Sequence, residues 1–243
     1  MKLKLTIAYD GAAFNGWQSQ PNGTAVQDVL EDALKRITGE RVIVHAAGRT
    51  DSGVHALGQS AHIEAPARFS VEKWQQILNF NLPPTLRVVG CKQVRSDFHA
   101  RLSSRGKVYR YLIRNRAVIL PHEAGRVWGV PEPLDLPVLR ATAGIFVGTH
   151  DFGGFGANRS SPGNTVRTIH RITVVKKASL ISLTFEGEGF LYRMVRMLTG
   201  AIVRVAQGRD DLATIESRLR NGRDPQWEQA APANGLHLVK VLY

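Results

Sequence analysis

The residues best suited to chemistry lie in one short stretch, Gly48-Arg49-Thr50-Asp51-Ser52-Gly53-Val54-His55-Ala56. An arginine, a carboxylate and a histidine follow directly after the apolar run Val42-Ile43-Val44. A strand that ends in a glycine-containing turn often carries reactive groups, because the strand fixes the position and the loop exposes the side chains. If the strand continued, its period of two would put Arg49 and Asp51 on one face. The guanidinium would then favour an ionised Asp51, ready to act as nucleophile or base.

Two plainer interpretations of this stretch stay open. Asp beside Gly is typical of turns, and an arginine and an aspartate two residues apart form surface salt bridges more often than catalytic pairs. Asp51 and His55 could also lie one helical turn apart and share a metal ion. No second cluster of histidine, cysteine or carboxylate residues completes such a site, so we expect no metal.

The composition indicates a polyanionic partner. The chain has 243 residues, a formal net charge of +12, a pI near 10.3 and 43% hydrophobic residues, enough for a core. The excess of Lys and Arg favours nucleic acid over a membrane surface, because no basic amphipathic helix with a strongly apolar face occurs. The single cysteine, Cys91, excludes an internal disulfide. With no signal peptide and no membrane-spanning run, we expect a cytoplasmic protein without membrane contact.

The spacing of apolar residues predicts two halves with a similar order of elements. The first half has strands over 3–9, 41–46, 57–64 and 86–94, a helix from a Thr24–Gln27 capping box to Gly39, and a helix capped by Ser70. The second has strands over 107–113, 168–176, 179–186 and 236–243, a helix capped by Asp135, and helices over 190–206 and 210–220.

This order predicts an α+β fold of two split βαβ halves, ferredoxin-like or RRM-like, with antiparallel sheets. Residues 1–100 would form the N-terminal half that carries the Asp51 loop. Residues 101–243 would form the C-terminal half, and the boundary would lie within residues 95–105.

The stretch from His99 to Tyr111 carries residues suited to RNA. It interleaves Arg101, Arg105, Lys107 and Arg110 with Tyr109 and Tyr111. Cations position a phosphate backbone and aromatic rings stack on bases, although a solvated edge strand shows similar charges.

Three further features are candidates for RNA contact. The loop of residues 14–23, which includes Gln18, could touch a nucleotide or pin itself to the core. The glycine-rich loop of residues 152–167 is too long for a simple connection, so we expect it to be either a binding loop or mobile. Arg193 and Arg196 lie on one flank of the predicted long helix, which faces either the site or solvent.

The Gly48–Ala56 stretch resembles the signature of the tRNA pseudouridine synthase A (TruA) family. The supporting motifs span most of the chain: Tyr9-Asp10-Gly11, Gly16-Trp17-Gln18, Asp97-Phe98-His99-Ala100-Arg101, Tyr109-Arg110-Tyr111, His150-Asp151-Phe152 and Met194-Val195-Arg196. The series is highly specific as a whole. Ser52 departs from the usual alanine, and Tyr192 stands where some relatives carry histidine.

The resemblance implies an isomerase that converts uridine to pseudouridine in the anticodon stem-loop of tRNA, at tRNA positions 38 to 40. It implies a fold with a central catalytic cleft, in which the C-terminal half, residues 101–243, completes the RNA-binding cleft. It also implies no metal, no organic cofactor, and a homodimer that holds the tRNA across both subunits. Asp51 would be the catalytic aspartate, Tyr109 would stack on the target base, and Arg49 would pair with Asp51 and help hold the flipped nucleotide. The predicted RNA contacts are Tyr109, Gln18, His55, His99, Arg101, Lys107, Arg110 and Arg196.

A second function class is a non-catalytic, RRM-like RNA-binding protein, because split βαβ sheets with aromatic residues bind single strands. Such a protein has little reason to place a carboxylate among cations, where it repels phosphate, so Arg49 and Asp51 favour the enzyme. A nuclease or other hydrolase is a more distant alternative, since no metal-binding carboxylate cluster and no acid–base histidine pair stands out.

Overall fold

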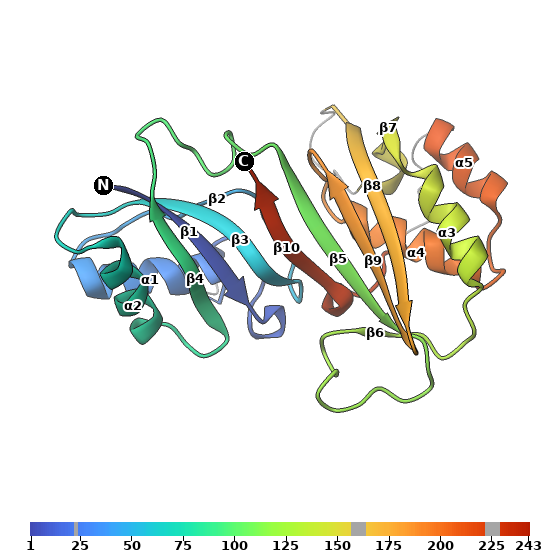
Figure 1. Ribbon diagram of the computed structural model, residues 1–243, viewed down its shortest axis with the longest axis horizontal. Coiled ribbons are helices and arrows are strands. Elements are labelled where there is room, and N and C mark those ends of the chain that lie inside the picture. Colours follow the sequence, from blue (N-terminus) through green and yellow to red (C-terminus); the bar gives the residue numbers. More distant parts are fainter. Residues whose placement is uncertain (22–23, 157–163, 222–228) are drawn as a thin grey trace. The chain divides into compact units, whose positions relative to one another are not determined.

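The structure is a computed structural model that describes residues 1–21, 24–156, 164–221 and 229–243. The chain forms two compact units (Figure 1), the first made of Met1–Arg105 with His237–Tyr243 and the second of Gly106–Leu236. Each unit is a β-sheet with helices packed on it, so the predicted α+β class is confirmed. The predicted division into residues 1–100 and 101–243 differs from this grouping chiefly in the last strand, which the structure assigns to the first unit.

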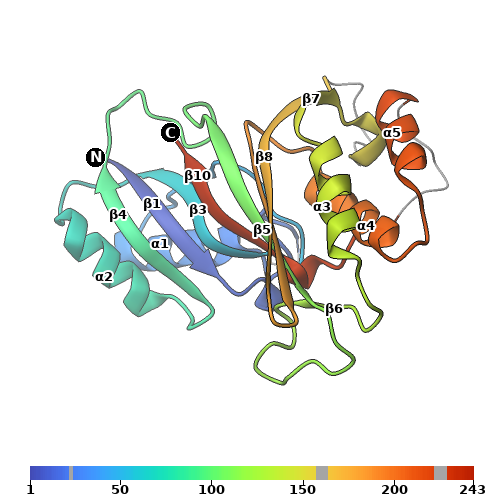
Figure 2. The ribbon, with the colours of Figure 1, turned by 45° about the vertical axis from the view of Figure 1, so that its right-hand side comes forward.

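The first unit follows the predicted strand-helix-strand-strand-helix-strand order. Its elements are β1 (Lys2–Tyr9), α1 (Val26–Thr38), β2 (His45–Ala46), β3 (His55–Glu64), α2 (Val71–Asn81), β4 (Leu86–Gln93) and β10 (Leu236–Leu242), with the 3-10 turn η1 (Gly11–Ala13) after β1. The strand order is β4-β1-β3-β10, and β2 pairs with β3. Figures 1 and 2 show α1 and α2 on one face of this sheet. Strand β3 therefore lies between β1 and the last strand, and its first residues carry the chain out of the Asp51 loop.

Burial along β1 explains why the helices pack on one face. Leu3, Leu5 and Ile7 are fully buried, and the residues between them are partly exposed. Helix α1 ends at Gly39, whose φ of 82° lies in the left-handed region that glycine adopts readily. Helix α2 begins at Ser70, whose hydroxyl accepts a hydrogen bond from the Lys73 amide. The predicted ends of both helices at Gly39 and Ser70 are confirmed.

Two local predictions in the first unit are wrong. The capping box does not use Thr24: helix α1 begins one residue later, and the Asp28 carboxylate accepts from the Ala25 amide at 3.3 Å. The strand predicted over residues 41–46 shrinks to His45–Ala46. The Val44 amide donates instead to the Glu31 carboxylate of α1 at 3.1 Å. A side chain therefore accepts the hydrogen bond that a neighbouring strand would otherwise accept.

The second unit has a sheet in the order β5-β9-β8-β7, with β6 paired to β5. Its elements are β5 (Gly106–Arg114), β6 (Trp128–Gly129), α3 (Leu136–Ile145), β7 (Gly148–Asp151), η2 (Gly153–Phe155), β8 (Val166–Lys177), β9 (Leu180–Gly187), α4 (Met194–Ala206), α5 (Leu212–Asn221) and η3 (Ala233–Gly235). The β8–β9 hairpin and the cap of α3 by Asp135 are confirmed. Figure 2 shows α3 and α4 next to each other beside this sheet.

Helix α4 begins later than the spacing predicts. The apolar period starts at Phe190, but Arg193 has a φ of 58°, which is incompatible with a right-handed helix, so α4 starts at Met194. The sheets also contain two short parallel pairings, β10 with β3 and β6 with β5, where only antiparallel ones were expected. Among the described residues, no helix is long and apolar enough to cross a membrane.

Candidate active site

Asp51 follows a threonine that is fixed from two sides. The Thr50 hydroxyl lies 2.8 Å from the Tyr9 hydroxyl, and its carbonyl oxygen accepts from the Trp17 amide at 3.1 Å. Tyr9 and Trp17 are both buried, and their rings pack together with centroids 6.2 Å apart. Burial raises the pKa of the Tyr9 hydroxyl well above its ordinary value, so this group stays protonated and keeps its hydrogen bond. The backbone before Asp51 is therefore held by the end of β1 and by the loop that follows it.

Two glycines allow these loops to touch. A Cβ atom on Gly16 would lie 2.7 Å from the Thr50 carbonyl oxygen and 3.2 Å from the Asp51 carbonyl carbon, and Gly16 has a φ of 86°. A Cβ on Gly11 would lie 2.2 Å from the Val54 carbonyl oxygen. Both distances are too short for any side chain, so the two glycines are required for the position of the Asp51 loop.

The predicted pairing of Arg49 with Asp51 is not formed. Residues 48–54 are a turn and not a strand: the Val54 amide donates to the Asp51 carbonyl at 3.2 Å, and Gly53 has a φ of 79°. The alternation that would put the two side chains on one face therefore does not apply. Arg49 is exposed, Asp51 is half-buried, and no ion pair within the described part of the chain joins them.

His55 lies at the start of β3 and is only 4% exposed. Its Nδ1 atom lies 3.1 Å from the Gly11 amide nitrogen and 3.2 Å from an Asp10 carboxylate oxygen. Its ring stacks on His237 of β10 at 4.7 Å. These contacts join the end of β1, the end of the Asp51 loop and the last strand, so a positioning role fits the burial better than direct RNA contact.

The helical alternative for Asp51 and His55 is wrong, since one lies in a turn and the other in a strand. Among the described residues, no group of three or more histidine, cysteine or carboxylate side chains is arranged to hold a metal ion.

The other predicted site residues of the first unit lie on loops. Gln18 is half-buried and donates to the Gln27 side chain at 3.1 Å. His99 and Arg101 belong to a tight turn after β4, where the His99 Nδ1 atom accepts the amides of Arg101 and Leu102 at 3.2 and 3.3 Å. Arg101 is exposed and His99 is half-exposed. Both side chains are therefore accessible to a ligand that binds the first unit.

The second unit holds Tyr109, Lys107 and Arg110 on β5. Tyr109 is 9% exposed, and its ring meets the edge of Phe190 at 5.3 Å. Tyr111, on the same face, is fully buried and donates to the Pro232 carbonyl at 2.7 Å. Arg110 is exposed on the opposite face and Lys107 is half-buried. The Tyr109 ring therefore has a fixed orientation, while Tyr111 serves the core.

Arg196 lies in the first turns of α4 and is half-buried. Its Nε atom donates to the Ala231 carbonyl at 2.8 Å, and the Ala231 amide donates back to the Arg196 carbonyl at 3.0 Å. This two-way contact holds the chain before β10 against α4. Of the two sequence alternatives, a solvated flank does not describe Arg196.

The sequence identified the motifs around Tyr9 and Gly16 but gave those residues no role. It also missed Gln59, a fully buried polar side chain that donates to the Gly48 carbonyl at 2.8 Å. A glutamine on the buried face of an alternating strand is the one signal that could have indicated it. The predicted binding loop of residues 152–167 falls in part, at residues 157–163, outside the described residues.

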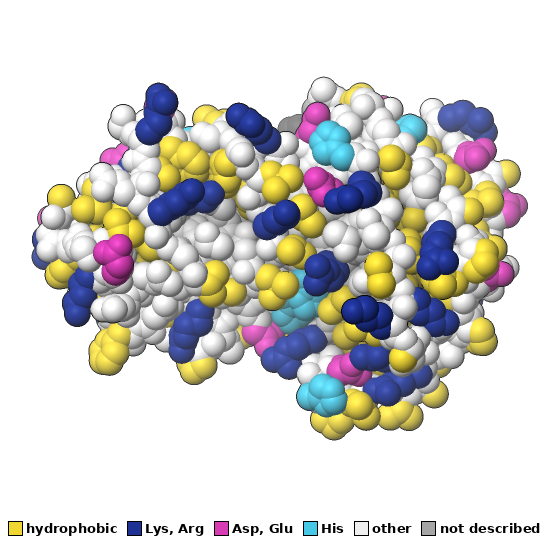
Figure 3. Space-filling view, viewed as in Figure 1, with side chains coloured by type: hydrophobic (Ala, Val, Ile, Leu, Met, Phe, Trp, Pro, Cys, Tyr) yellow, Lys and Arg dark blue, Asp and Glu magenta, His cyan; other side chains and the backbone are white. Residues whose placement is uncertain are grey.

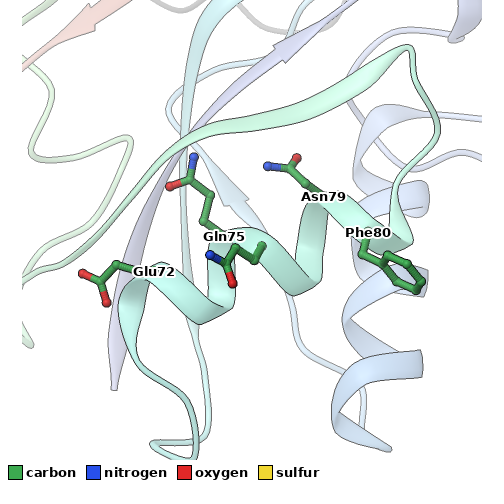
Figure 4. A pocket seen from close by; sticks show the side chains of 5 residues that line it. Glu72, Gln75, Asn79 and Phe80 are labelled. Atoms are coloured by element: carbon green, nitrogen blue, oxygen red, sulfur yellow. The ribbon is translucent and has the colours of Figure 1, made fainter.

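The surface carries many cations, and a shallow pocket on it lies away from these residues. Figure 3 shows Lys and Arg side chains distributed over the visible face, in keeping with the net charge of +12. The pocket in Figure 4 is lined by one side of α2, with the exposed Phe80 at one end and Glu72 at the other. None of the predicted site residues lines it.

A family model described as tRNA pseudouridine synthase matches residues 5–102 and 143–243. The match includes Asp51 and the loop on which it rests. The chain belongs to the tRNA pseudouridine synthase family.

Curated relatives specify the member that the chain resembles. Proteins named tRNA pseudouridine synthase A are 40% identical in Akkermansia muciniphila (100% of this chain, 95% of the relative), 37% in a Thermoanaerobacter strain (99% of each) and 40% in Rhodopseudomonas palustris (100% and 99%). A solved structure of a Cbf5-Nop10-Gar1 complex aligns with 83% of this chain and 44% of that chain at 12% identity, with a TM-score of 0.38 that is too low to support an argument. The relatives and the family establish an isomerase that acts on tRNA.

The close contact at Gly16 predicts a specific defect. In Gly16→Ala, the new Cβ would meet the Thr50 carbonyl at 2.7 Å, so the Asp51 loop must shift. A displacement of about 1 Å can reduce turnover about 100-fold, so we expect a loss of that order in kcat for pseudouridine formation, with little change in tRNA affinity.

Gly125→Ala is the matched control for this prediction. Gly125 also has a positive φ, of 75°, but a Cβ there meets nothing within 4 Å. Both variants should lower the melting temperature through backbone strain, and only Gly16→Ala should lower kcat. Equal kcat in the two variants would contradict the inferred contact.

Proposed function

We propose that this enzyme converts uridine to pseudouridine in the anticodon stem-loop of tRNA, at tRNA positions 38 to 40, with Asp51 as the catalytic carboxylate. The observation that carries the proposal is the support of the Asp51 loop, in which the backbone is hydrogen-bonded at Gly48, Thr50 and Asp51 itself. A loop tied down over four residues, with a half-buried carboxylate, is typical of a preorganised reactive group. The anticodon specificity is what the resemblance of the Gly48–Ala56 stretch and its supporting motifs to the TruA family implies.

The reaction suits a carboxylate. The glycosidic bond must break, the uracil must rotate, and a carbon–carbon bond must form to the same sugar. A carboxylate can attack either the anomeric carbon of the ribose or the uracil ring, and both routes pass through a covalent intermediate. Neither route needs a redox partner, since the product is an isomer of the substrate. We propose no metal and no organic cofactor for the reaction.

The target uridine must first leave the stem-loop stack, which costs a few kcal/mol. We assign Tyr109 to stacking on the flipped base, since its ring is held edge-on by Phe190 and a base–aromatic stack offsets about 1–3 kcal/mol. We assign Arg49, which is exposed, to contact with a phosphate of the flipped nucleotide. Gln18, His99, Arg101, Lys107, Arg110 and Arg196 are proposed to contact the RNA backbone or its bases.

Two further properties follow the family resemblance. We propose a homodimer that holds the tRNA across both subunits, and a cytoplasmic location, where tRNA is processed. The net charge of +12 fits a large polyanionic ligand of this kind. A non-catalytic RNA-binding role is the alternative, and the experiment on Asp51 separates it from the enzyme.

Replacing Asp51 by asparagine removes the anion and keeps the size. We expect Asp51→Asn to bind an anticodon stem-loop tRNA as well as the unmodified protein does, and to form no detectable pseudouridine, because an amide is not a nucleophile of comparable strength. Asp135→Asn, at the cap of α3, is the control that should keep full activity, since asparagine also caps helices. Conversion by Asp51→Asn at the normal rate would make Asp51 structural. If the unmodified protein and Asp51→Asn both bind the tRNA and neither converts uridine, the RNA-binding alternative would be favoured.

Replacing Tyr109 separates stacking from binding. Tyr109→Leu should lower kcat about 5- to 150-fold, the equivalent of 1–3 kcal/mol of lost base stacking, and should change tRNA affinity much less. Tyr109→Phe keeps the ring and its contact with Phe190, so its kcat should stay within a few-fold of normal. Equal losses of kcat and affinity in Tyr109→Leu would contradict a role confined to the flipped base.

A further inference from the structure

The backbone amide and the backbone carbonyl of Ala100 are each hydrogen-bonded to a side chain far away in the sequence. Its amide donates to Nδ1 of His62 at 3.1 Å, and its carbonyl accepts from the Tyr243 hydroxyl at 2.8 Å. Ala100 is fully buried. His62 lies in β3 and Tyr243 follows β10, so two neighbouring strands of the first unit's sheet grip one residue of a surface turn.

We propose that His62 and Tyr243 are positioning residues that fix the turn of residues 98–102, so that His99 and Arg101 meet the phosphate backbone of tRNA in one defined geometry. This inference rests on the proposed tRNA contacts of His99 and Arg101. It assigns to His62 and Tyr243 a role in substrate affinity without direct contact to the substrate.

Hydrogen bonds within the turn join its residues to one another, so that the turn forms one unit. His99 accepts the amides of Arg101 and Leu102, and the Ser103 hydroxyl accepts the His99 amide at 3.0 Å. The buried side of the turn is the Ala100 peptide, while the opposite side presents Arg101 and a 78% exposed Leu102. The two hydrogen bonds to Ala100 therefore set the direction of the Arg101 side chain. A cation that is held in place loses less conformational entropy on binding.

Lys2 supplies a second attachment on the near side of the turn. Its ammonium group donates to the carbonyls of Ser96 at 2.6 Å and Phe98 at 3.2 Å. The carbonyls that Lys2 contacts come before His99 in the chain. The direction of residues 99–102 therefore depends on the hydrogen bonds to Ala100. Loss of the His62 or Tyr243 contact should therefore loosen the turn without detaching it.

The grip requires a neutral His62, because Nδ1 must keep its lone pair to accept the Ala100 amide. Its ring stacks on His45 with centroids 4.9 Å apart and meets His99 at 4.7 Å. Burial, and then the nearby His45, His99 and Lys2, lower the pKa of His62 to about 4, and Glu64 opposes them. The imidazole is therefore neutral at physiological pH, with its proton on Nε2.

Tyr243 is fixed by its own neighbours. Its hydroxyl lies 2.8 Å from the Ser60 hydroxyl, its ring packs on Phe98 at 5.1 Å, and the Lys4 ammonium lies 3.6 Å from the ring centroid. Removing the hydroxyl alone leaves both ring contacts in place. Tyr243→Phe is therefore a mild variant that tests the hydrogen bond to Ala100 and not the packing.

The test measures tRNA affinity as a function of salt, together with kcat and KM, for the intact protein carrying His62→Leu, His62→Asn or Tyr243→Phe. His62→Leu and Tyr243→Phe should weaken tRNA binding about 2- to 12-fold, the equivalent of one hydrogen bond, with kcat at saturating tRNA unchanged. The slope of log affinity against log salt should fall by about one, because one phosphate contact is lost. His62→Asn should restore affinity, since its side-chain oxygen can accept the Ala100 amide where Nδ1 did.

A double variant separates positioning from general stability. In an Arg101→Ala background, Tyr243→Phe should cause a smaller further loss of affinity than it does alone, because only one of the two contacts that it positions, His99, then remains. His45→Leu removes a stacked imidazole that makes no described hydrogen bond to the turn, and it should bind tRNA normally. Additive losses with Arg101→Ala, or an unchanged affinity and salt slope in Tyr243→Phe, would overturn the proposal. An unmodified protein that forms no pseudouridine would refute the proposed function instead.

The lowered pKa of His62 also predicts how stability depends on pH. The unfolded chain takes up this proton near pH 6.5 and the folded chain only near pH 4, so folding is opposed as the pH falls between these values. The melting temperature of the unmodified protein should therefore drop between pH 6.5 and 4. His62→Asn, which cannot titrate, should show a shallower drop over this range. Parallel curves for the two proteins would contradict a buried, neutral His62.

Discussion

The contact between two loops at the end of β1 is the constraint on which the candidate active site depends. Gly11 and Gly16 let the backbone of one loop approach the backbone of residues 50–54 more closely than any side chain permits. Thr50 then finds a hydrogen-bond partner on each side, in Tyr9 and Trp17. The backbone that carries Asp51 owes its position to these neighbours.

The proposed site residues are divided between the two compact units. The first carries the carboxylate and the turn with His99 and Arg101, and the second carries Tyr109 and Arg196. Within its own unit, Tyr109 meets Phe190, Arg196 donates to the Ala231 carbonyl, and the turn is held by His62 and Tyr243. If these groups contact RNA as proposed, their existing orientation reduces the entropy lost on binding.

Buried polar groups around β3 serve position more than stability. Gln59, Ser60 and His62 are nearly inaccessible to solvent, yet each makes a hydrogen bond: Gln59 to Gly48, Ser60 with Tyr243, and His62 to Ala100. Apolar residues there would pack as well but would hold neither loop. A hydrogen bond of this kind contributes only about 1 kcal/mol net, but it selects one loop geometry over others.

The amino-acid sequence alone determined the class of fold, the order of its elements and the residues of the Asp51 stretch. Strand alternation in β1, the glycine after α1 and the serine before α2 are local signals, and the structure confirms them because local geometry decides them. Tertiary contacts decided the rest. Whether Arg49 faces Asp51 depended on a turn that alternation does not foresee, and the start of α4 depended on the left-handed Arg193. The pairing of β10 with β3 and the grip of His62 and Tyr243 on Ala100 join residues far apart in the chain, and no local pattern encodes a contact that only folding brings together.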